Sequence, residues 1–533
     1  MKKIIFYSLI LILATSLRFW HLSSQPPGLT WDEAAIGYNA YSILKTGKDE
    51  FGARFPLIFK SFGDYKPGLY IYLTVPSVAV FGLSEFAVRL PSALFGVVAV
   101  LTAGLLVELL TGNLAVGLLT SLALAVSPWA IHFSRGAWES NIFVSFTIIG
   151  IYFFYNAIKR NFSLFPSLFF FTAGLFLYQS AKLYSPLIVL LLIVLNWRDI
   201  KPKMSATITI LFLVIWGGFY FNAFTSTSGN RIARLSVLGY KPPVSETTKK
   251  IDNNNPFSIK LFHSQTDLAV RLVASRYLYH LSPEFLFYSP PEPSPRENIY
   301  RMGMLYLFDF IWLISGLVYL VRLKDSKVKI LIISLLLLGP LPAALTLSEF
   351  SPVRSLLLVF PLSILIGFGI YNLYKFNRFV FVVSFMVYLY TVALGLDLYF
   401  RHSHDFYAKG FNYGYKQAVE LIAKFRPDKA YFTDVYGQPY IYYLFYSKYD
   451  PATYQKNNHF ISNGVDVGRV DRVGEVEFHQ TGKGDVISIK NSLFIDTRDN
   501  FPDNFDYNLG QIEIYDQISY DNGDPIFRWI KTK

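Results

Sequence analysis

The sequence predicts a polytopic α-helical membrane protein that ends in a small soluble α/β domain. Three observations lead to this fold class. Of the 533 residues, 53% are hydrophobic and only 16% are charged, whereas a soluble protein of this length needs a larger charged surface. Apolar runs of nearly membrane-spanning length recur as far as residue 399. From residue 400 onward, short alternating segments and turn residues replace them.

Composition also excludes several classes of protein. The hydrophobic content is too high for a disordered chain or a collagen-like fibre, and the charged content is too low for an ordinary cytosolic enzyme. The chain has no cysteine, which excludes disulfides, thiolate catalysis and Cys-ligated metal sites. Aromatic residues make up 18%, as suits a protein that meets both interfaces of a bilayer.

Eleven apolar runs are candidate spans, since a spanning helix needs roughly 20 residues. The first run follows Lys2 and Lys3, as in a signal peptide. Because Arg18, Phe19 and Trp20 come next without a small-residue cleavage site, we expect an uncleaved helix. The predicted spans are residues 4–20, 88–110, 112–131, 142–158, 164–180, 183–197, 206–224, 303–321, 328–347, 353–374 and 378–399.

Charge predicts the orientation in the plasma (inner) membrane. Residues 1–399 carry a net charge of +14 and residues 400–533 a net charge of −2, so the positive charge suits loops that face anionic lipid, not nucleic acid. With a cytoplasmic N-terminus and no span at 67–83, all but one of the inner connections are basic. We therefore expect 67–83 to be an interfacial or re-entrant helix on the outer side.

This orientation predicts two domains. Residues 1–399 form the membrane domain, and residues 400–533 form an extracytoplasmic α/β domain. The tail contains an amphipathic helix at 418–425. Its predicted short strands lie at 429–436, 476–480, 485–497 and 511–516. The outer loops of the membrane domain are 21–87, 132–141 and 225–302, the last with a helix around Gln265–His280.

Candidate chemistry gathers in the outer loops. Asp32 and Glu33 are adjacent carboxylates at the start of a helix-like stretch, where an anion is favoured. Helix capping alone explains one Asp, so function and capping are equally good interpretations. Lys66 stands where the chain returns to the membrane, and it can bind a lipid phosphate or snorkel at the interface. The short second loop adds Arg135 and Glu139, which is more polarity than a hairpin needs.

Other charged residues are weaker candidates. Arg231 opens the third outer loop and Arg354 stands at an outer helix start, so either can contact an anion, although a solvated loop explains Arg231 better. Asp309 is an acid inside an apolar run. Because no metal-binding, Walker or dinucleotide motif is present, we expect no cofactor, and a divalent metal requirement stays open.

Three motifs together carry a family resemblance. They are TWDEAAIGYNAYSILKTG (30–47), GDYKPGLYIYL (63–73) and EFAVRLPSALFG (85–96). With them the chain strongly resembles bacterial membrane glycosyltransferases of the GT-C class. Its relatives there are the protein O-mannosyltransferase-like family, related to dolichyl-phosphate-mannose-protein mannosyltransferases, and the aminoarabinose transferases that modify lipid A. The resemblance implies a GT-C fold and transfer of a sugar from a polyprenyl-phosphate carrier on the outer membrane face.

The resemblance also implies roles for single residues. Asp32 matches the essential first-loop carboxylate, Glu33 its acidic neighbour, Lys66 the lysine that contacts the carrier phosphate, and Glu139 the acid of the second outer loop. The aminoarabinose transferases have an arginine where this chain has Ala35. They also have a zinc-site glutamate just before the Lys-Pro pair, and Tyr65 stands there in this chain. Neither that zinc site nor aminoarabinose is therefore expected.

The expected reaction is transfer of a single sugar, with inversion at the anomeric carbon, to a lipid, glycan or protein. Asp32 is expected to act as the base, Lys66 and Arg135 to hold the phosphate, and Glu139 to orient the acceptor or the sugar. A transporter or flippase is one alternative, but such proteins place binding groups near the membrane midplane and often have internal repeats. An O-antigen polymerase or ligase is another, and a receptor or scaffold is a third.

Overall fold

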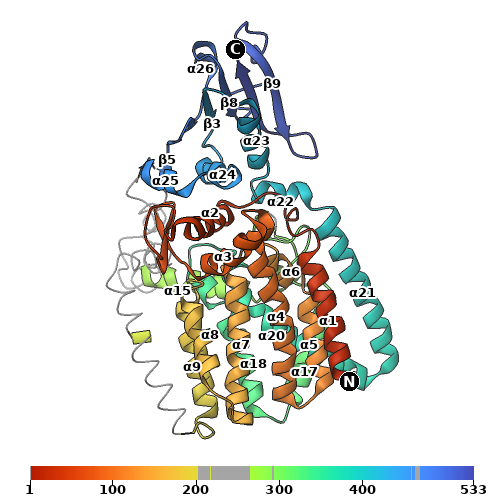
Figure 1. Ribbon diagram of the computed structural model, residues 1–533. Coiled ribbons are helices and arrows are strands. Elements are labelled where there is room, and N and C mark those ends of the chain that lie inside the picture. The colour runs from red at the N-terminus through yellow and green to blue at the C-terminus, as the bar shows by residue number, and fades with distance from the viewer. Residues whose placement is uncertain (1, 202–215, 218–264, 291–292, 458, 462–467) are drawn as a thin grey trace, which may run out of the picture.

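The structure is a computed structural model that describes residues 2–201, 216–217, 265–290, 293–457, 459–461 and 468–533. A bundle of long helices forms its lower part, and a sheet with short helices rises above one end of the bundle (Figure 1). The bundle helices are α1 (Lys2–Phe19), α4 (Glu85–Thr111), α5 (Leu114–Val126), α7 (Glu139–Arg160), α8 (Phe165–Leu175), α9 (Ala181–Asn196), α17 (Asp309–Arg322), α18 (Ser326–Leu338), α20 (Val359–Phe376) and α21 (Arg378–Arg401).

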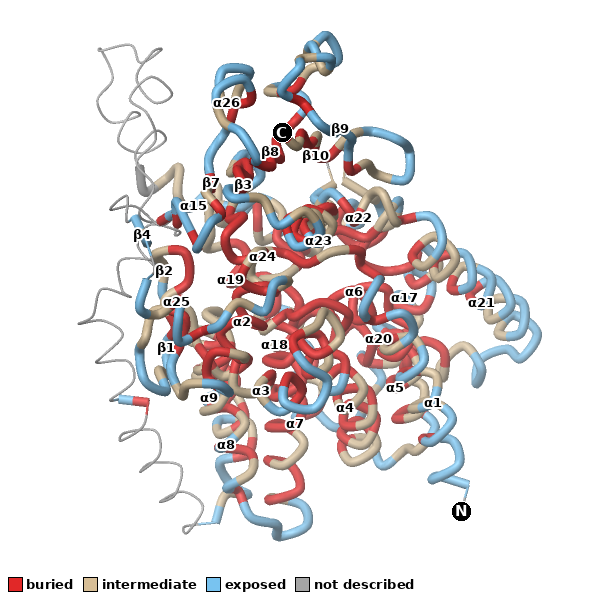
Figure 2. The backbone as a smooth tube through the Cα atoms, turned by 45° about the horizontal axis from the view of Figure 1, so that its top comes forward, coloured by how far each residue is buried: buried red, intermediate tan, exposed pale blue. Residues whose placement is uncertain are grey.

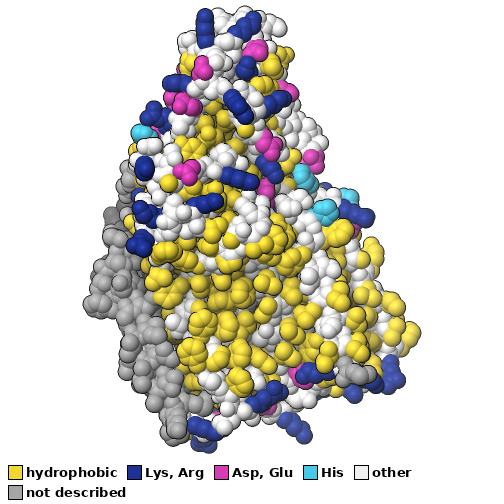
Figure 3. All heavy atoms as spheres, viewed as in Figure 1, with side chains coloured by type: hydrophobic (Ala, Val, Ile, Leu, Met, Phe, Trp, Pro, Cys, Tyr) yellow, Lys and Arg dark blue, Asp and Glu magenta, His cyan; other side chains and the backbone are white. Residues whose placement is uncertain are grey.

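The bundle is that of a multi-pass membrane protein. Among the described residues, five helices are long and apolar enough to cross a membrane, or six if one bent pair counts as a single span. Hydrophobic side chains cover most of the bundle face that Figure 3 shows, and Lys and Arg gather at its lower rim. The helical membrane fold is thus confirmed. The count of eleven spans stays a prediction, and the span at 206–224 lies almost wholly outside the described residues.

The predicted span at 112–131 is a bent pair of helices in the structure. Helix α5 ends at Val126, and α6 (Pro128–Ser134) continues at an angle of 59°. Pro128 has no N–H to donate into α5, and its ring crowds the preceding turn, which favours a break at this point. Instead, the Ser127 side chain accepts a hydrogen bond from the Ala130 amide, at 3.3 Å, and caps a new helix.

The first outer loop folds into α2 (Trp31–Thr46), the hairpin β1 (Ile58–Ser61) and β2 (Asp64–Pro67), and α3 (Leu69–Phe81). A capping box starts α2, because the Thr30 side chain accepts from the Glu33 amide and the Glu33 carboxylate accepts from the Thr30 amide. The hairpin was not among the predicted elements, since each strand has only four residues. It carries Lys66 towards the start of α2.

The tail contains a mixed six-stranded sheet with the order β6-β7-β3-β8-β10-β9, in which β3 is parallel to β7 and β8. The predicted helix at 418–425 is confirmed as part of α23 (Tyr415–Phe425). The predicted strand at 485–497 is wrong in its first part, where Lys483–Ser488 forms α26. The strands are β3 (Lys429–Phe432), β6 (Arg472–Val473), β7 (Val476–Phe478), β8 (Ser492–Asp496), β9 (Ile512–Ser519) and β10 (Pro525–Thr532).

The first outer loop and the tail share one apolar core. Ala34 and Tyr38 of α2 belong to the same buried cluster as Tyr440 and Phe445 of α24 (Pro439–Tyr446). Figure 2 shows buried backbone in both helices. Helix α25 (Pro451–Asn457) also packs on α2. The tail therefore supports the first outer loop, and the domain boundary at residue 400 stays a prediction.

Candidate active site

Asp32 lies at the centre of the candidate site, in the first turn of α2. Its Oδ1 pairs with Nζ of Lys66 on β2, and its Oδ2 lies 2.6 Å from a terminal nitrogen of Arg296. The Asp32 side chain is 21% exposed. One carboxylate is thus held between two cations, which come from the segments predicted to be the first and third outer loops.

Arg296 is a residue that the sequence did not indicate. It lies between α16 (Pro283–Phe287) and α17, in a proline-rich stretch with no motif around it. Its guanidinium stands over the Trp138 ring, 5.1 Å from the ring centre, and its backbone oxygen lies 3.0 Å from Nε2 of His132. These contacts aim the guanidinium at Asp32, as cation–π stacking fixes its plane.

The two cations decide the ionisation of Asp32. Burial raises the pKa of its carboxyl group, but the charges of Lys66 and Arg296 and their hydrogen bonds outweigh burial. The pKa therefore lies well below the usual range of an aspartic acid. At neutral pH the site holds a carboxylate ion and two positively charged groups.

Glu139, the first residue of α7, borders the same small cavity as Asp32 and Lys66. The cavity has a volume of about 20 Å³, which is room for roughly one water molecule. The structure thus brings together three residues that the sequence indicated. The lining residues are Asp32, Ala35, Ile36, Asn39, Phe59, Ser61, Lys66, Pro67, Tyr70, Ile71 and Glu139.

Glu33 lies away from this cavity, in a structural network. Its side chain is 3% exposed, and its Oε1 lies 3.0 Å from Nε of Arg89 and accepts from the Ala137 amide at 3.0 Å. Its Oε2 completes the capping box with Thr30. Because helix positions one residue apart point about 100° apart, Asp32 and Glu33 face different surroundings. We therefore leave Glu33 out of the proposed catalytic set.

Arg135 is also used structurally. It is fully buried and donates to the backbone oxygens of Leu17, Trp20 and Gln25, at 2.9, 2.6 and 3.0 Å. Its guanidinium stands over the Phe400 ring. Since both terminal nitrogens have partners, we do not carry Arg135 into the proposal as a phosphate ligand.

Two candidate arginines remain, Arg231 and Arg354. Arg231 lies outside the described residues. Arg354 donates to the Thr346 hydroxyl at 3.1 Å. It also acts electrostatically on Glu297, a second acid that the sequence did not indicate. Burial raises the pKa of Glu297, and the charges of Arg296 and Arg354 act against that rise.

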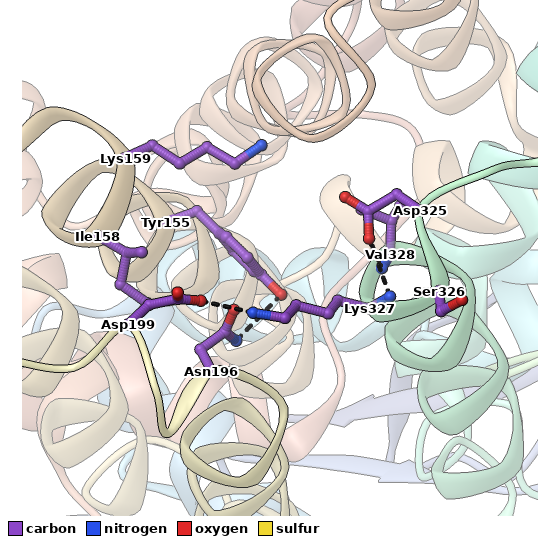
Figure 4. Close-up of a pocket in the computed structure, with 9 residues that line it drawn as sticks. All are labelled: Tyr155, Ile158, Lys159, Asn196, Asp199, Asp325, Ser326, Lys327 and Val328. Carbon is purple, nitrogen blue, oxygen red and sulfur yellow. Dashed lines mark hydrogen bonds and ion pairs between the residues drawn. The ribbon is translucent and has the colours of Figure 1, made fainter.

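Two other polar features are separate from the Asp32 cavity. Among the described residues, one group of three could hold a metal ion, namely His404, Asp405 and Asp521, and none of them lines the cavity. A second hollow, of about 560 Å³, lies at the far end of α7 from Glu139 (Figure 4). There Lys327 and Asp199 pair at 2.5 Å.

Comparison with known proteins supports the resemblance. Residues 65–217 match the profile of the family described as dolichyl-phosphate-mannose-protein mannosyltransferase. ArnT from Cupriavidus metallidurans, in a crystal structure with bound undecaprenyl phosphate, has 12% sequence identity and a TM-score of 0.50, covering 99% of this chain and 97% of that one. AglB, an oligosaccharyltransferase from Archaeoglobus fulgidus, has 11% identity and a TM-score of 0.48, covering 79% and 58%. No curated protein matches this sequence.

The resemblance predicted from the motifs is confirmed by these findings. The fold is that of ArnT, a GT-C membrane protein, over nearly the whole chain. The family match begins at Tyr65, directly before Lys66, and extends beyond Glu139. Lys66 and Glu139 therefore lie in the matched part of the chain, and Asp32 lies before it.

Proposed function

We propose that the protein is a membrane glycosyltransferase. It takes one sugar from a polyprenyl-phosphate carrier and transfers it to a hydroxyl group of a lipid, a cell-envelope glycan or a protein on the outer face of the membrane. The observation that carries the proposal is the Asp32 carboxylate held between Lys66 and Arg296. The family match around Lys66 and the ArnT fold support it.

The two cations suit a phosphate leaving group. Lys66 and Arg296 can turn from Asp32 to the phosphate that links sugar and carrier, and both can donate charge-assisted hydrogen bonds to it. As the phosphate takes over their positive charge, the pKa of Asp32 rises towards its ordinary value. Asp32 then becomes a stronger base at the moment when donor is bound.

Asp32 removes the proton of the acceptor hydroxyl as its oxygen attacks the anomeric carbon. The bond from that carbon to the phosphate oxygen breaks, and the electron pair leaves with the carrier phosphate. Attack by one nucleophile from the opposite face inverts the anomeric carbon. Glu139, at the same cavity, orients the acceptor or stabilises positive charge on the sugar. Arg354, and Arg231 from the third outer loop, are further candidate phosphate contacts.

No cofactor enters this proposal. Lys66 and Arg296 supply the positive charge that a metal ion supplies to phosphates elsewhere, so chelation of divalent ions is expected to leave transfer unchanged. The transporter and polymerase or ligase alternatives share lipid-linked ligands with this function. The transporter is less well supported because the charges of the site meet in segments between the long bundle helices, which we expect on the outer side.

The test is a transfer assay with purified protein in lipid vesicles. Radiolabelled polyprenyl-phosphate hexoses are offered with mixed membrane acceptors to the wild type and to Asp32→Asn. Loss of the base is expected to lower transfer at least about 100-fold, with the fold intact. Asp64→Asn, on the same hairpin as Lys66, is the matched control and should transfer normally. Full activity of Asp32→Asn, or no sugar release by the folded wild type, would contradict the proposal.

A further inference from the structure

Glu50 is a fully buried acid just beyond α2 that the proposed mechanism does not use. It forms a reciprocal pair with Asn39 of α2. The Asn39 amide donates to Glu50 Oε1 at 3.0 Å, and the Glu50 backbone amide donates to Asn39 Oδ1 at 3.0 Å. Asn39 also lines the Asp32 cavity. Glu50 is therefore one side chain removed from the candidate site.

The other side of Glu50 faces the tail. Its carboxyl group interacts with the hydroxyl of Tyr440 on α24 and acts electrostatically on Tyr454 of α25. The Glu50 carboxyl group and the two tyrosine hydroxyls are buried there. Polar groups from the loop and from the tail thus meet in a buried space.

The surroundings favour the neutral acid. Burial raises the pKa of Glu50, the Asn39 hydrogen bond opposes the rise, Asp49 adds to it, and the result is about 8. The Lys60 ammonium stands over the rings of Phe51 and Phe460 instead of on Glu50. The titratable groups that face Glu50 are Asp49, Tyr38, Lys60, Tyr440 and Tyr454.

The tail forms hydrogen bonds at both ends of α2. The Tyr442 hydroxyl donates to the backbone oxygen of Leu29, just before α2, at 3.0 Å. The Gln455 side-chain amide donates to the Ser42 and Thr46 hydroxyls near the C-terminal end of α2, each at 3.0 Å. Glu50 adds a contact to Asn39, which lies on the face of α2 that borders the cavity.

We propose that Glu50, buried beside Asn39 of α2 and the tail helices α24 and α25, is a positioning residue for the transfer reaction. It fixes Asn39, and with it the face of α2 that presents Asp32. The inference rests on the proposed function, since positioning matters only if Asp32 reacts. Through the Glu50 side chain, the tail would then help to hold Asp32 in position.

The proposal predicts a pH dependence with a definite sign. Below its ordinary pKa of 4.5, Glu50 is neutral both folded and unfolded. Between 4.5 and about 8 only the unfolded chain ionises, so stability falls as the pH rises. Above about 8, Glu50 ionises within the fold beside Asp49, and the α2 contact loosens. Transfer is therefore expected to fall on the alkaline side.

The test measures transfer from pH 6 to pH 10 for the wild type, Glu50→Gln and Glu50→Ala. The Gln variant keeps a neutral side chain with an acceptor oxygen for Asn39. It is expected to retain most of the neutral rate and to move the alkaline limb up by at least one pH unit. The Ala variant should lose at least tenfold in kcat. Glu85→Gln, which removes a surface pair with Lys416 between α4 and α23, should leave the limb in place.

A second measurement keeps this inference separate from the proposed function. Hydrogen exchange of the α2 amides, corrected for intrinsic rates, should lose protection above pH 8 in the wild type but not in Glu50→Gln. If no carrier sugar is transferred but this difference appears, the function fails and the structural role of Glu50 stands. If the alkaline limb and the α2 protection are the same in wild type and Gln variant, the inference is wrong.

Discussion

At the scale of single residues, the central feature of the site is the Asp32 carboxylate, which is shared between two cations. Asp32 has two cationic partners, whereas its neighbour Glu33 has one buried arginine and two backbone amides. The first arrangement can open to a phosphate, because its members are partly exposed. The second cannot open without leaving a buried charge unpaired, which is strongly destabilising. The adjacent acids Asp32 and Glu33 therefore differ in whether their partners can move to another ligand.

Removal of one cation should move the ionisation of Asp32. In Lys66→Ala the pKa of Asp32 rises from its lowered position towards the ordinary range, because only Arg296 remains. The acid limb of kcat/KM, which reports the free enzyme, is therefore expected to move to higher pH. The KM for the donor should rise at least tenfold. A pH series of initial rates with carrier-linked sugar measures both.

The control for this series is Lys60→Ala on the neighbouring strand, whose ammonium stands over aromatic rings and not over Asp32. It should leave the acid limb in place. An unmoved limb in Lys66→Ala would mean that the pair does not set the charge of Asp32.

The sequence could predict some of these residues and not others. Asp32, Lys66 and Glu139 could be predicted as one site because the charge pattern assigns their loops to one side of the membrane. Arg296 was not, since it meets Asp32 only through a contact between positions 264 residues apart. The structural use of Arg135 was equally hidden, because backbone oxygens that accept from a side chain leave no mark in a sequence.

At the scale of elements, prediction succeeded where the periodic pattern was long. The bundle helices and α23 follow from apolar patterning, but the bend at Pro128 changes one span into two helices. The four-residue strands of the β1–β2 hairpin are too short for alternation to identify. The segment DVIS of α26 lies just before the residues of β8 and was grouped with them, yet an Asp485 carboxylate that accepts from the Gly482 amide starts a helix there.

The contact between α2 and α24 gives a prediction at this scale. A Cβ atom at Gly37 would come within 2.4 Å of the Phe445 ring and 2.6 Å of Val88. Gly37→Ala is therefore expected to destabilise the protein by about 1–3 kcal/mol, as overpacked positions do, and to lower transfer by displacing α2. Thermal unfolding and protease sensitivity of the tail measure the first effect.

Gly484→Ala is the matched control, because a Cβ there meets nothing within 4 Å. Its stability should stay within about 0.5 kcal/mol of the wild type. Equal losses in the two variants would show that the close packing of α2 against α24 is not what Gly37 preserves.

At the scale of the whole molecule, the distribution of charge predicts which side faces the cell interior. Lys and Arg gather at the lower rim of the bundle, at the end opposite the Asp32 site (Figures 1 and 3). The tail has a net charge of −2 and shares its core with the first outer loop. A tail that packs on this loop lies on the same side of the membrane as the loop does. The side of the membrane on which the tail lies is therefore also the side of the Asp32 site.

The orientation can be tested cleanly because the chain has no cysteine. Asn522→Cys places a single exposed thiol in the turn between β9 and β10, and Lys324→Cys places one between α17 and α18. A membrane-impermeant maleimide is expected to label the first variant in intact cells and the second only after the membrane is opened. The reverse pattern would place the basic rim outside. It would also put Asp32 on the cytoplasmic side, where acceptors of the cell envelope are not available.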